Sequence, residues 1–188
     1  NLKNQKEIYF KISGNSEKLP IEIQFDRQLL TLIGIWLADG CYDKKSIIFS
    51  TFDKEDREIV KEVANRFQLN VKIHSDGGSR MINSSTLKFI FKEIFELRGN
   101  AYTKRIPSWI FNLSREQISF ILKGMFSGDG CVSDKEIVIP LSSIQLLKDI
   151  QTLLLGFEIN LRIGKKRKDG TYNAGISNLK GWTKFKEN

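Results

Sequence analysis

The hydrophobic and polar positions of the chain follow one pattern twice, in residues 26–94 and in residues 114–188. Each copy reads as a helix that ends at Asp-Gly, a short strand, a second helix, a hairpin and a third helix. Residues suited to helix N-caps predict helices that begin near 26, 53, 114 and 142 and end near 38, 67, 128 and 155. Alternation predicts strands near 46–50, 70–75, 79–83, 135–139, 159–164 and 171–176.

The two copies align when the chain is shifted against itself by 90 residues. Residues 32–41 then fall on 122–131, 47–49 on 137–139 and 69–73 on 159–163. From residue 87 the offset grows to 92, which predicts a second hairpin two residues longer than the first. We therefore expect a duplicated unit, with residues 1–25 as an N-terminal extension and residues 95–113 as the linker.

The first helix of each copy carries two small residues four positions apart, which places them on one helix face. They are Gly34 and Ala38 in the first copy and Gly124 and Gly128 in the second. Small residues at this spacing allow two helix backbones to approach closely, a packing best documented in membranes. We expect these two helices to pack against each other about a pseudo-twofold axis.

Each of these helices ends in an aspartate, Asp39 or Asp129. A carboxylate at a helix C-terminus, close to a second carboxylate, is electrostatically unfavourable, and a divalent metal ion would relieve both penalties. Asp-Gly after a single helix is also typical of a C-terminal turn in which glycine takes the left-handed conformation. Because the motif recurs at equivalent positions, we favour a metal-binding pair.

The composition limits the kinds of catalytic, metal and disulfide sites that the chain can contain. The chain has 188 residues, 30 Lys and Arg against 22 Asp and Glu, one His and two Cys, with a net charge of +8. A disulfide scaffold, a Cys-rich zinc module and a Ser-His-Asp triad are disfavoured. The sequence contains neither an apolar stretch of membrane-spanning length nor a signal-peptide pattern, so we expect a cytoplasmic protein without a membrane partner.

The positive charge is concentrated near the C-terminus. Residues 161–188 hold eight basic and two acidic residues, or +6 of the net charge. Residues 165–168 form a basic run directly before Asp169-Gly170, a pair typical of hairpin turns, between two predicted strands. A cationic hairpin tip is suited to phosphate contacts, which predicts a nucleic-acid partner.

The repeated motif resembles that of a known family. Leu-x-Gly-x-x-x-x-Asp-Gly, at residues 32–40 and 122–130, resembles the LAGLIDADG (dodecapeptide) homing endonucleases in their single-chain, two-motif form. The Lys-Arg-Ile-Pro block at residues 104–107 resembles the Lys-x-Ile-Pro block of endonuclease domains embedded in inteins. The resemblance covers roughly residues 26–185.

This resemblance implies an α+β fold of two αββαββα halves related by a pseudo-twofold axis, with two antiparallel sheets forming a DNA-binding saddle. It implies a monomer with internal pseudosymmetry that binds double-stranded DNA. The implied function is a site-specific endonuclease that cuts both strands at a long target by metal-dependent phosphodiester hydrolysis, for the homing of an intein or an intron.

The resemblance also implies roles for individual residues. Asp39 and Asp129 would be the ligands of Mg²⁺, with Mn²⁺ as a substitute, and the backbone carbonyls of Ala38 and Gly128 would add metal contacts. Lys104 would polarise the attacking water or stabilise the charge of the transition state.

DNA contacts would come from polar strand residues and from the basic hairpin. The base-reading candidates are Lys72, His74, Arg80, Asn83, Arg162, Lys165, Arg167, Tyr172 and Asn173. The phosphate-contacting candidates are Lys165, Lys166 and Lys168.

Several alternatives stay open. The repeat equivalent of Lys104 would fall beyond Asn188, so the enzyme could nick one strand, or Lys180, Lys184 or Lys186 could substitute. The chain lacks the terminal His-Asn of splicing inteins, so we expect no self-splicing, and both intein and intron origins remain open. The rival functions are a catalytically silent DNA- or RNA-binding relative, such as a maturase or transcription regulator, and a structural interaction domain.

Overall fold

The computed structural model describes residues 8–51, 53–132 and 136–176, and of residues 128, 129, 131 and 132 it describes only the backbone. The first half follows the order αββαββα, with a π-helical turn extending its last helix. Its elements are α1 (Arg27–Asp39), β3 (Gly40–Tyr42), β4 (Ser46–Phe49), α2 (Lys54–Arg66), β5 (Val71–Ile73), β6 (Arg80–Asn83), α3 (Ser85–Phe89) and η1 (Ile90–Ile94).

A 3₁₀ helix, η2 (Ser108–Asn112), lies in the linker, and the second half then repeats the order of the first. The position of its last helix falls outside the described residues. The elements of this half are α4 (Arg115–Asp129), β7 (Cys131–Val132), β8 (Ile137–Leu141), α5 (Ile144–Leu155), β9 (Arg162–Lys166) and β10 (Tyr172–Ile176).

The predicted helix starts are confirmed by the caps in the structure. Asp26 accepts a hydrogen bond from the Leu29 amide at the start of α1, and Ser114 forms a capping box with Gln117 at the start of α4. Ser143, rather than Ser142, caps α5. None of the helices in the described part of the chain is long and apolar enough to cross a membrane.

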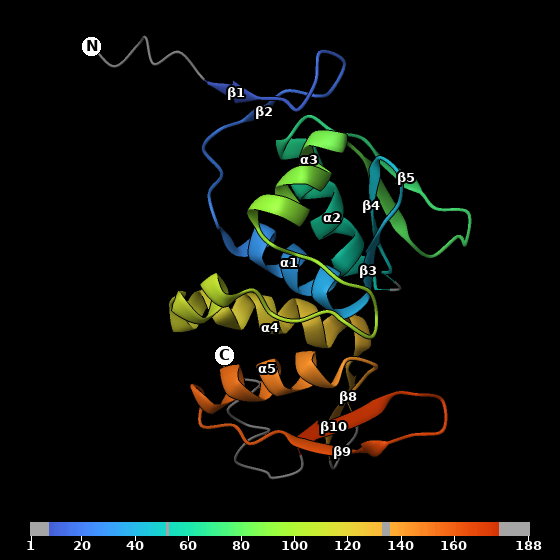
Figure 1. Ribbon diagram of the computed structural model, residues 1–188, viewed down its shortest axis with the longest axis vertical. Coiled ribbons are helices and arrows are strands. Elements are labelled where there is room, and N and C mark those ends of the chain that lie inside the picture. Colours follow the sequence, from blue (N-terminus) through green and yellow to red (C-terminus); the bar gives the residue numbers. More distant parts are fainter. Residues whose placement is uncertain (1–7, 52, 133–135, 177–188) are drawn as a thin grey trace.

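Each half contains a four-stranded antiparallel sheet, with strand orders β3-β4-β6-β5 and β7-β8-β10-β9. One face of each sheet packs on the helices, because Ile47, Phe49 and Ile82 in the first sheet, like Ile139 and Ile176 in the second, belong to the buried core. In Figure 1 the halves lie on either side of the pair α1 and α4, and both sheets lie on the same side of the helices. The duplicated α+β fold is thus present.

The structure corrects three predictions about the strands. The short strands β3 and β7, which directly follow each Asp-Gly, escaped the alternation analysis. Strand β8 begins and ends two residues later than predicted and includes Pro140. The second hairpin is longer by four residues, not two, because Lys72 pairs with Met81 whereas Arg162 pairs with Gly175. A β-bulge in β9 and β10 absorbs part of this excess.

The N-terminal segment forms a ribbon of β1 (Tyr9–Phe10) and β2 (Leu19–Pro20). It is fastened to the first half by Glu17, whose carboxylate accepts a hydrogen bond from the Ser84 hydroxyl and whose carbonyl accepts one from Thr86. Leu19 is fully buried. This extension therefore packs on α3, away from the ends of α1 and α4 (Figure 1).

Candidate active site

Helices α1 and α4 touch backbone to backbone. A Cβ atom on Gly34 would lie 2.1 Å from the Ile121 carbonyl oxygen, and one on Gly124 would lie 2.1 Å from the Thr31 carbonyl oxygen. Carbon atoms do not approach oxygen so closely, so only glycine allows this crossing at either position. Ala38 is buried near the end of α1, and contacts of Gly128 lie outside the description. This close crossing draws the C-terminal ends of the two helices together.

The glycine after each aspartate does not form a left-handed cap. Gly40 has φ −98° and ψ 156°, and Gly130 has φ −74° and ψ 130°, so both are extended. A Cβ on Gly40 would lie 2.3 Å from Cδ1 of Trp36, and one on Gly130 would lie 2.1 Å from the Phe126 carbonyl oxygen. These glycines allow the chain to pass closely over the last helical turn into a strand, which differs from a simple C-terminal turn.

Asp39 stands at this junction between helix and sheet. Its side chain is exposed, while its carbonyl oxygen accepts a hydrogen bond from the Ser50 amide at 3.1 Å. An exposed carboxylate is a suitable hard ligand for Mg²⁺. Among the described residues, no three His, Cys, Asp or Glu side chains form a group that could hold an ion. The side chain of Asp129 lies outside the description, so Asp39 fits an ion only as one ligand of a site completed by other groups.

Lys104 lies beneath the end of α1 with only 3% of its surface exposed. Its ammonium donates hydrogen bonds to the carbonyl oxygens of Trp36 at 2.8 Å and Ala38 at 3.4 Å, and lies 4.7 Å from the centre of the Trp36 ring. The last carbonyls of a helix attract cations, and an aromatic face adds to this attraction. The lysine and Asp39 thus flank the same helix end, and the Ala38 carbonyl already faces a cation.

The linker that carries Lys104 is held by the second half. The Asp149 carboxylate accepts a hydrogen bond from the Ile106 amide at 2.9 Å, and the Ser143 hydroxyl donates one to the Lys104 carbonyl at 2.7 Å. Both partners belong to the start of α5 or to its cap. Gly99 has φ +97°, and a Cβ there would lie 2.8 Å from the Lys104 amide nitrogen. The linker therefore reaches α1 from a fixed anchor on α5.

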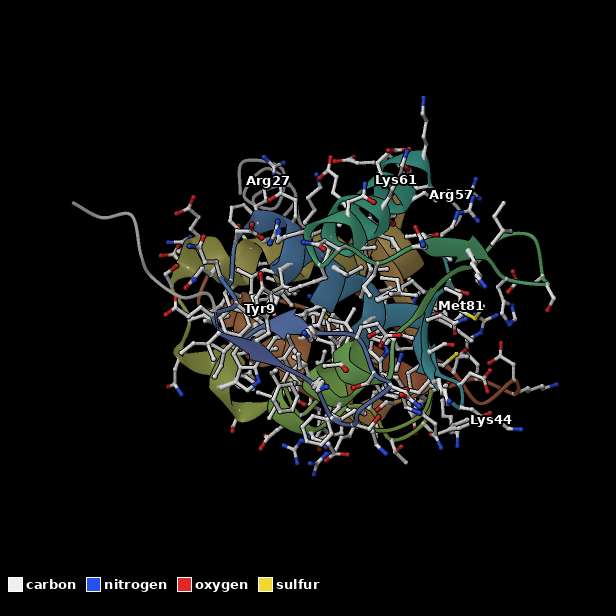
Figure 2. All side chains as sticks on the ribbon, turned by 90° about the horizontal axis from the view of Figure 1, so that it is seen from above. Tyr9, Arg27, Lys44, Arg57, Lys61 and Met81 are labelled. Carbon is white, nitrogen blue, oxygen red and sulfur yellow. The ribbon has the colours of Figure 1, made fainter. Side chains whose placement is uncertain are left out.

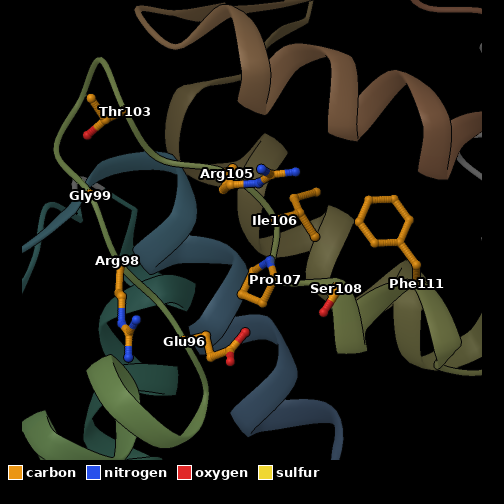
Figure 3. Close-up of a pocket in the computed structure, with 9 residues that line it drawn as sticks. All are labelled: Glu96, Arg98, Gly99, Thr103, Arg105, Ile106, Pro107, Ser108 and Phe111. Atoms are coloured by element: carbon orange, nitrogen blue, oxygen red, sulfur yellow. The ribbon is translucent and has the colours of Figure 1, made fainter.

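A pocket of about 630 Å³ opens beside this linker. Figure 3 shows Arg105 and Ile106 above it and Glu96 below. Because Asp39 does not line it, the pocket is separate from the predicted chemistry. The lining residues are Glu96, Arg98, Gly99, Thr103, Arg105, Ile106, Pro107, Ser108 and Phe111.

The surroundings of Cys41 show that charges of both signs meet near the start of β3. Burial raises the pKa of its thiol, Lys104 opposes this increase, and the carboxylates of Asp39, Asp43 and Asp76 add to it. The thiol is exposed and free of any disulfide. It therefore sits in the same electrostatic environment as the aspartate and lysine at the end of α1.

The open face of the first sheet is defined by the strand register. One row runs across all four strands through Cys41, Ile48, Met81 and Lys72. These positions alternate with the buried residues of the helix-covered face. Figure 2 shows Met81 on the side of the sheet that faces away from the helices. Asn83 pairs with Ser46 and accepts its hydroxyl hydrogen bond, so Asn83 and Lys72 lie on this open face.

The open face of the second sheet has an equivalent row through Val138, Gly175 and Arg162. Asn173 lies on the same face of β10, two positions before Gly175, and pairs with Pro140. Beyond the strands, Arg167 donates a hydrogen bond to Asn173 at 3.3 Å. The predicted phosphate-contacting residues of the hairpin, all of them exposed, are Lys165, Lys166 and Lys168.

Three other predicted DNA contacts lie elsewhere. Arg80 pairs with Phe49, and Tyr172 packs against the hydrophobic core, so both lie on the helix-covered side of their sheets. This corrects the expectation that they share the open faces. His74 is half-buried after β5, with its Nδ1 3.1 Å from a carboxylate oxygen of Asp76.

The sequence analysis missed a basic cluster at the outer edge of the first sheet. Lys54, Arg57 and Lys61 on α2 line a groove of about 360 Å³ together with Lys72 and Arg80. Figure 2 shows Arg57 and Lys61 on neighbouring turns of this helix. Spacings of three and four residues place side chains on one helix face, so the signal was present in the sequence. We call these three α2 residues the α2 cations.

Comparison with known proteins identifies the family of the chain. Residues 26–96 and 116–188 match the LAGLIDADG-like domain. The chain belongs to the LAGLIDADG family. It is 37% identical over 136 residues to the DNA polymerase II large subunit of Thermococcus kodakarensis and 29% identical over 138 residues to the uncharacterized protein MJ1054 of Methanocaldococcus jannaschii. These alignments cover 69% and 66% of the chain but only 8% and 15% of the relatives.

Solved structures share the fold of this LAGLIDADG chain. The crystal structure of I-DmoI in complex with DNA and Mn superimposes with a TM-score of 0.67 at 14% identity, covering 87% of the chain and 96% of I-DmoI. Full-length DUF199/WhiA from Thermatoga maritima superimposes with a TM-score of 0.62 at 16% identity, covering 89% of the chain and 57% of WhiA. At such identities the likeness establishes the fold.

Proposed function

We propose that this LAGLIDADG domain is a site-specific, metal-dependent DNA endonuclease that acts as a monomer. The observation that carries the proposal is the end of α1, where an exposed carboxylate, Asp39, and a buried ammonium, Lys104, flank the same helical turn. Membership in the LAGLIDADG family and the crystallisation of I-DmoI with DNA and Mn support this function.

In this proposal, Asp39 and Asp129 would be the carboxylate ligands of a divalent ion, and the backbone carbonyl of Gly128 would add a contact. Structures of I-DmoI variants with target DNA in the presence of Mg and of Mn support Mg²⁺ as the ion and Mn²⁺ as its substitute. The bound ion would supply a Lewis acid that lowers the pKa of water and neutralises phosphate charge. The Ala38 carbonyl accepts a hydrogen bond from the Lys104 ammonium at 3.4 Å, and its second lone pair would be the one to contact the ion.

Two side chains of the protein are proposed to position and stabilise the reacting groups during hydrolysis. Water attacks the phosphorus atom, the bond to the 3′ oxygen breaks, and the proton lost by water returns through solvent to the leaving oxygen. As a ligand of the ion, Asp39 would position the reacting phosphate at the end of α1. Lys104, fixed by two carbonyls and by the linker, places a positive charge where the phosphate gains negative charge. A preorganised charge of this kind favours the transition state over the ground state.

DNA would lie across the open faces of both sheets, as two halves of one target. Lys72, Asn83, Arg162 and Asn173 are the polar residues that the register places there, and they are proposed to contact bases. Lys165, Lys166, Lys168 and the α2 cations are proposed to contact phosphates at the margins. His74 and Arg167 lie at the hairpins and would contact the DNA next to these positions.

The test begins with binding. A duplex that the protein selects from a random library is labelled on each strand in turn and incubated with the protein in Mg²⁺, in Mn²⁺ or in EDTA. We expect cleavage with either metal and none in EDTA, and we expect the strand labels to distinguish a double-strand cut from a nick.

The matched variants are Asp39→Asn and Asp43→Asn, because both residues are exposed near the start of the first sheet but only Asp39 ends α1. Asp39→Asn should abolish cleavage while binding persists, and Asp43→Asn should retain both. Selected duplexes that are bound but neither cut nor nicked in either metal would instead establish a DNA-binding protein without nuclease activity.

A further inference from the structure

The centres of the two open faces differ most at one position, which is methionine in the first sheet and glycine in the second. In the first sheet the central row contains two apolar side chains, Ile48 and Met81, which pair directly with each other. In the second sheet the equivalent pair is Val138 and Gly175. The two pairs are equivalent because each has a basic residue, Lys72 or Arg162, at the next position outward.

Ile48 and Met81 do not serve the core of the first half. Their neighbours along the strands, Ile47, Phe49 and Ile82, are completely buried on the helix-covered face, whereas Ile48 and Met81 are only half-buried. Because side chains alternate between faces, both point away from the helices, and Figure 2 shows this for Met81. An apolar pair thus occupies the middle of a surface whose margins are basic.

Gly175 is not required by the fold. A Cβ atom there would have as its nearest neighbour a carboxylate oxygen of Glu136 at 3.5 Å, with Ile137 and Val138 atoms at 3.7 and 3.8 Å, which are ordinary contact distances. Its backbone is also in the ordinary extended strand conformation. Because Gly175 has no side chain, the centre of the second open face is recessed relative to that of the first. The packing of the core does not benefit from this.

We propose that Met81, paired with Ile48, reads a thymine methyl group in the half-site bound by the first sheet, and that the second half-site lacks this preference at the equivalent base pair, where Gly175 replaces Met81. This inference rests on the proposed function, in which DNA lies on the open faces. In the major groove the C5 methyl of thymine is the one apolar group that a base pair presents, and it is recognised by apolar contact. Lys72 would contribute polar contacts to the first half-site, and Arg162 would do so in the second.

The reciprocal substitutions follow from this geometry. Met81→Gly removes the larger apolar side chain from the first face, and Gly175→Met adds one to the second, where an added Cβ atom makes only ordinary contacts, the nearest with the Glu136 carboxylate at 3.5 Å. Neither change touches the helix-covered face, so both variants should keep the wild-type circular dichroism spectrum. If thymine is read by apolar contact, the preference should disappear with the first change and appear in the other half-site with the second.

The experiment uses the duplex selected by the wild-type protein, in EDTA so that no strand is cut. The thymidines of one half-site at a time are replaced by deoxyuridine, which removes only the methyl group, and the Kd is measured by fluorescence anisotropy at fixed salt. Burial of one carbon contributes about 0.8 kcal/mol, so each contacted methyl should change Kd about fourfold. We expect this loss in one half-site only, and we expect Met81→Gly to be insensitive to the replacement.

Gly175→Met is the second, independent arm. Its selected duplex should be sensitive to deoxyuridine in both half-sites. Equal sensitivity of both half-sites in the wild type, a selected site without thymine, or a deoxyuridine effect that survives Met81→Gly would overturn the inference while leaving nuclease function standing. Failure to select any duplex from the library would instead overturn the proposed function.

Discussion

Helices α1 and α4 meet symmetrically, whereas the surroundings of their C-terminal ends differ. A Cβ atom added at Gly34 or at Gly124 would lie 2.1 Å from a carbonyl oxygen of the opposite helix in both cases. Yet the end of α1 faces the Lys104 ammonium, and the end of α4 is held through Ser127, whose hydroxyl donates to the buried carboxylate of Asp56 at 3.0 Å.

The buried carboxylates also lie at non-equivalent places in the two halves. Asp56 is in the first turn of α2, where the second half has Leu146, and Asp149 is in the second turn of α5, where the first half has Ile59. Asp56 contacts the opposite half through Ser127, and Asp149 contacts the linker. Among the described residues, the helix crossing uses equivalent glycines in the two halves, whereas the polar groups hydrogen-bonded near the two helix ends differ.

Lys104→Met should have the largest effect and should break the symmetry of cleavage. It removes one preorganised charge, a change worth about 100- to 1000-fold in rate in comparable sites. Because Lys104 lies at the end of α1, we expect the strand cut beside Asp39 to be slowed by this factor. Single-turnover assays with each strand labelled would measure the two rates separately, with exposed Lys44→Met as the matched control. Equal slowing of both strands would contradict the assignment.

Gly34→Ala and Gly124→Ala should each destabilise the protein by about 1–3 kcal/mol or more, because the added methyl overlaps a carbonyl oxygen of the facing helix. The two values should agree with each other, since the crossing is symmetric. Denaturant unfolding monitored by circular dichroism provides the measurement. Gly175→Ala is the control and should stay near wild type, and a large difference between the two seam variants would show that the crossing is not equivalent from both sides.

Replacing the α2 cations by glutamine should weaken DNA binding without changing sequence preference. If each contacts one phosphate, the slope of log K against log salt should become shallower by about 0.9 for each residue replaced. The measurement is a salt titration of the selected duplex. The comparison variant removes three cations of the second half, Lys165, Lys166 and Lys168. Different slope changes would show that one half contributes more of the phosphate contacts.

Asp56→Asn should have the smallest effect, confined to the pH dependence of stability. Burial raises the pKa of Asp56 above its ordinary value of 3.8, with the Ser127 hydrogen bond as the largest opposing cause. A raised folded-state pKa means that the folded protein holds the proton more tightly, so this group's contribution to stability falls as the pH rises above 3.8. The melting temperature of the wild type should show this decline and that of Asp56→Asn should lack it. Asp43→Asn is the exposed control and should follow the wild type.

Local signals in the sequence were sufficient for much of the fold. The caps at Asp26 and Ser114 fixed the starts of α1 and α4, and the small residues four positions apart in each helix, which include Gly34 and Gly124, predicted close helix packing. Strands β3 and β7 were missed because two or three residues are too few to show alternation. The length of the second hairpin was missed because a bulge alters pairing without altering composition.

Less of the candidate site could be predicted. Asp39 follows from the repeated motif, and Lys104 was singled out by resemblance, but nothing in the sequence indicates that the lysine is buried against the end of α1. That placement depends on tertiary contacts of the linker, between Lys104 and Ser143, 39 residues apart, and between Ile106 and Asp149, 43 residues apart. The side of the sheet on which Arg80 lies likewise depends on register, because its neighbours in sequence do not define a face.

The spare room above Gly175 has a consequence for how such a protein can change its target over generations. A substitution there adds a recognition group without displacing any atom of the interior. The same step at Gly34 would collide with the facing helix. If DNA lies on the open faces as proposed, new specificities can arise on the strands one residue at a time, each through a folded intermediate, while the crossing of α1 and α4 is left unaltered. For redesign, this makes position 175 the natural first site to randomise.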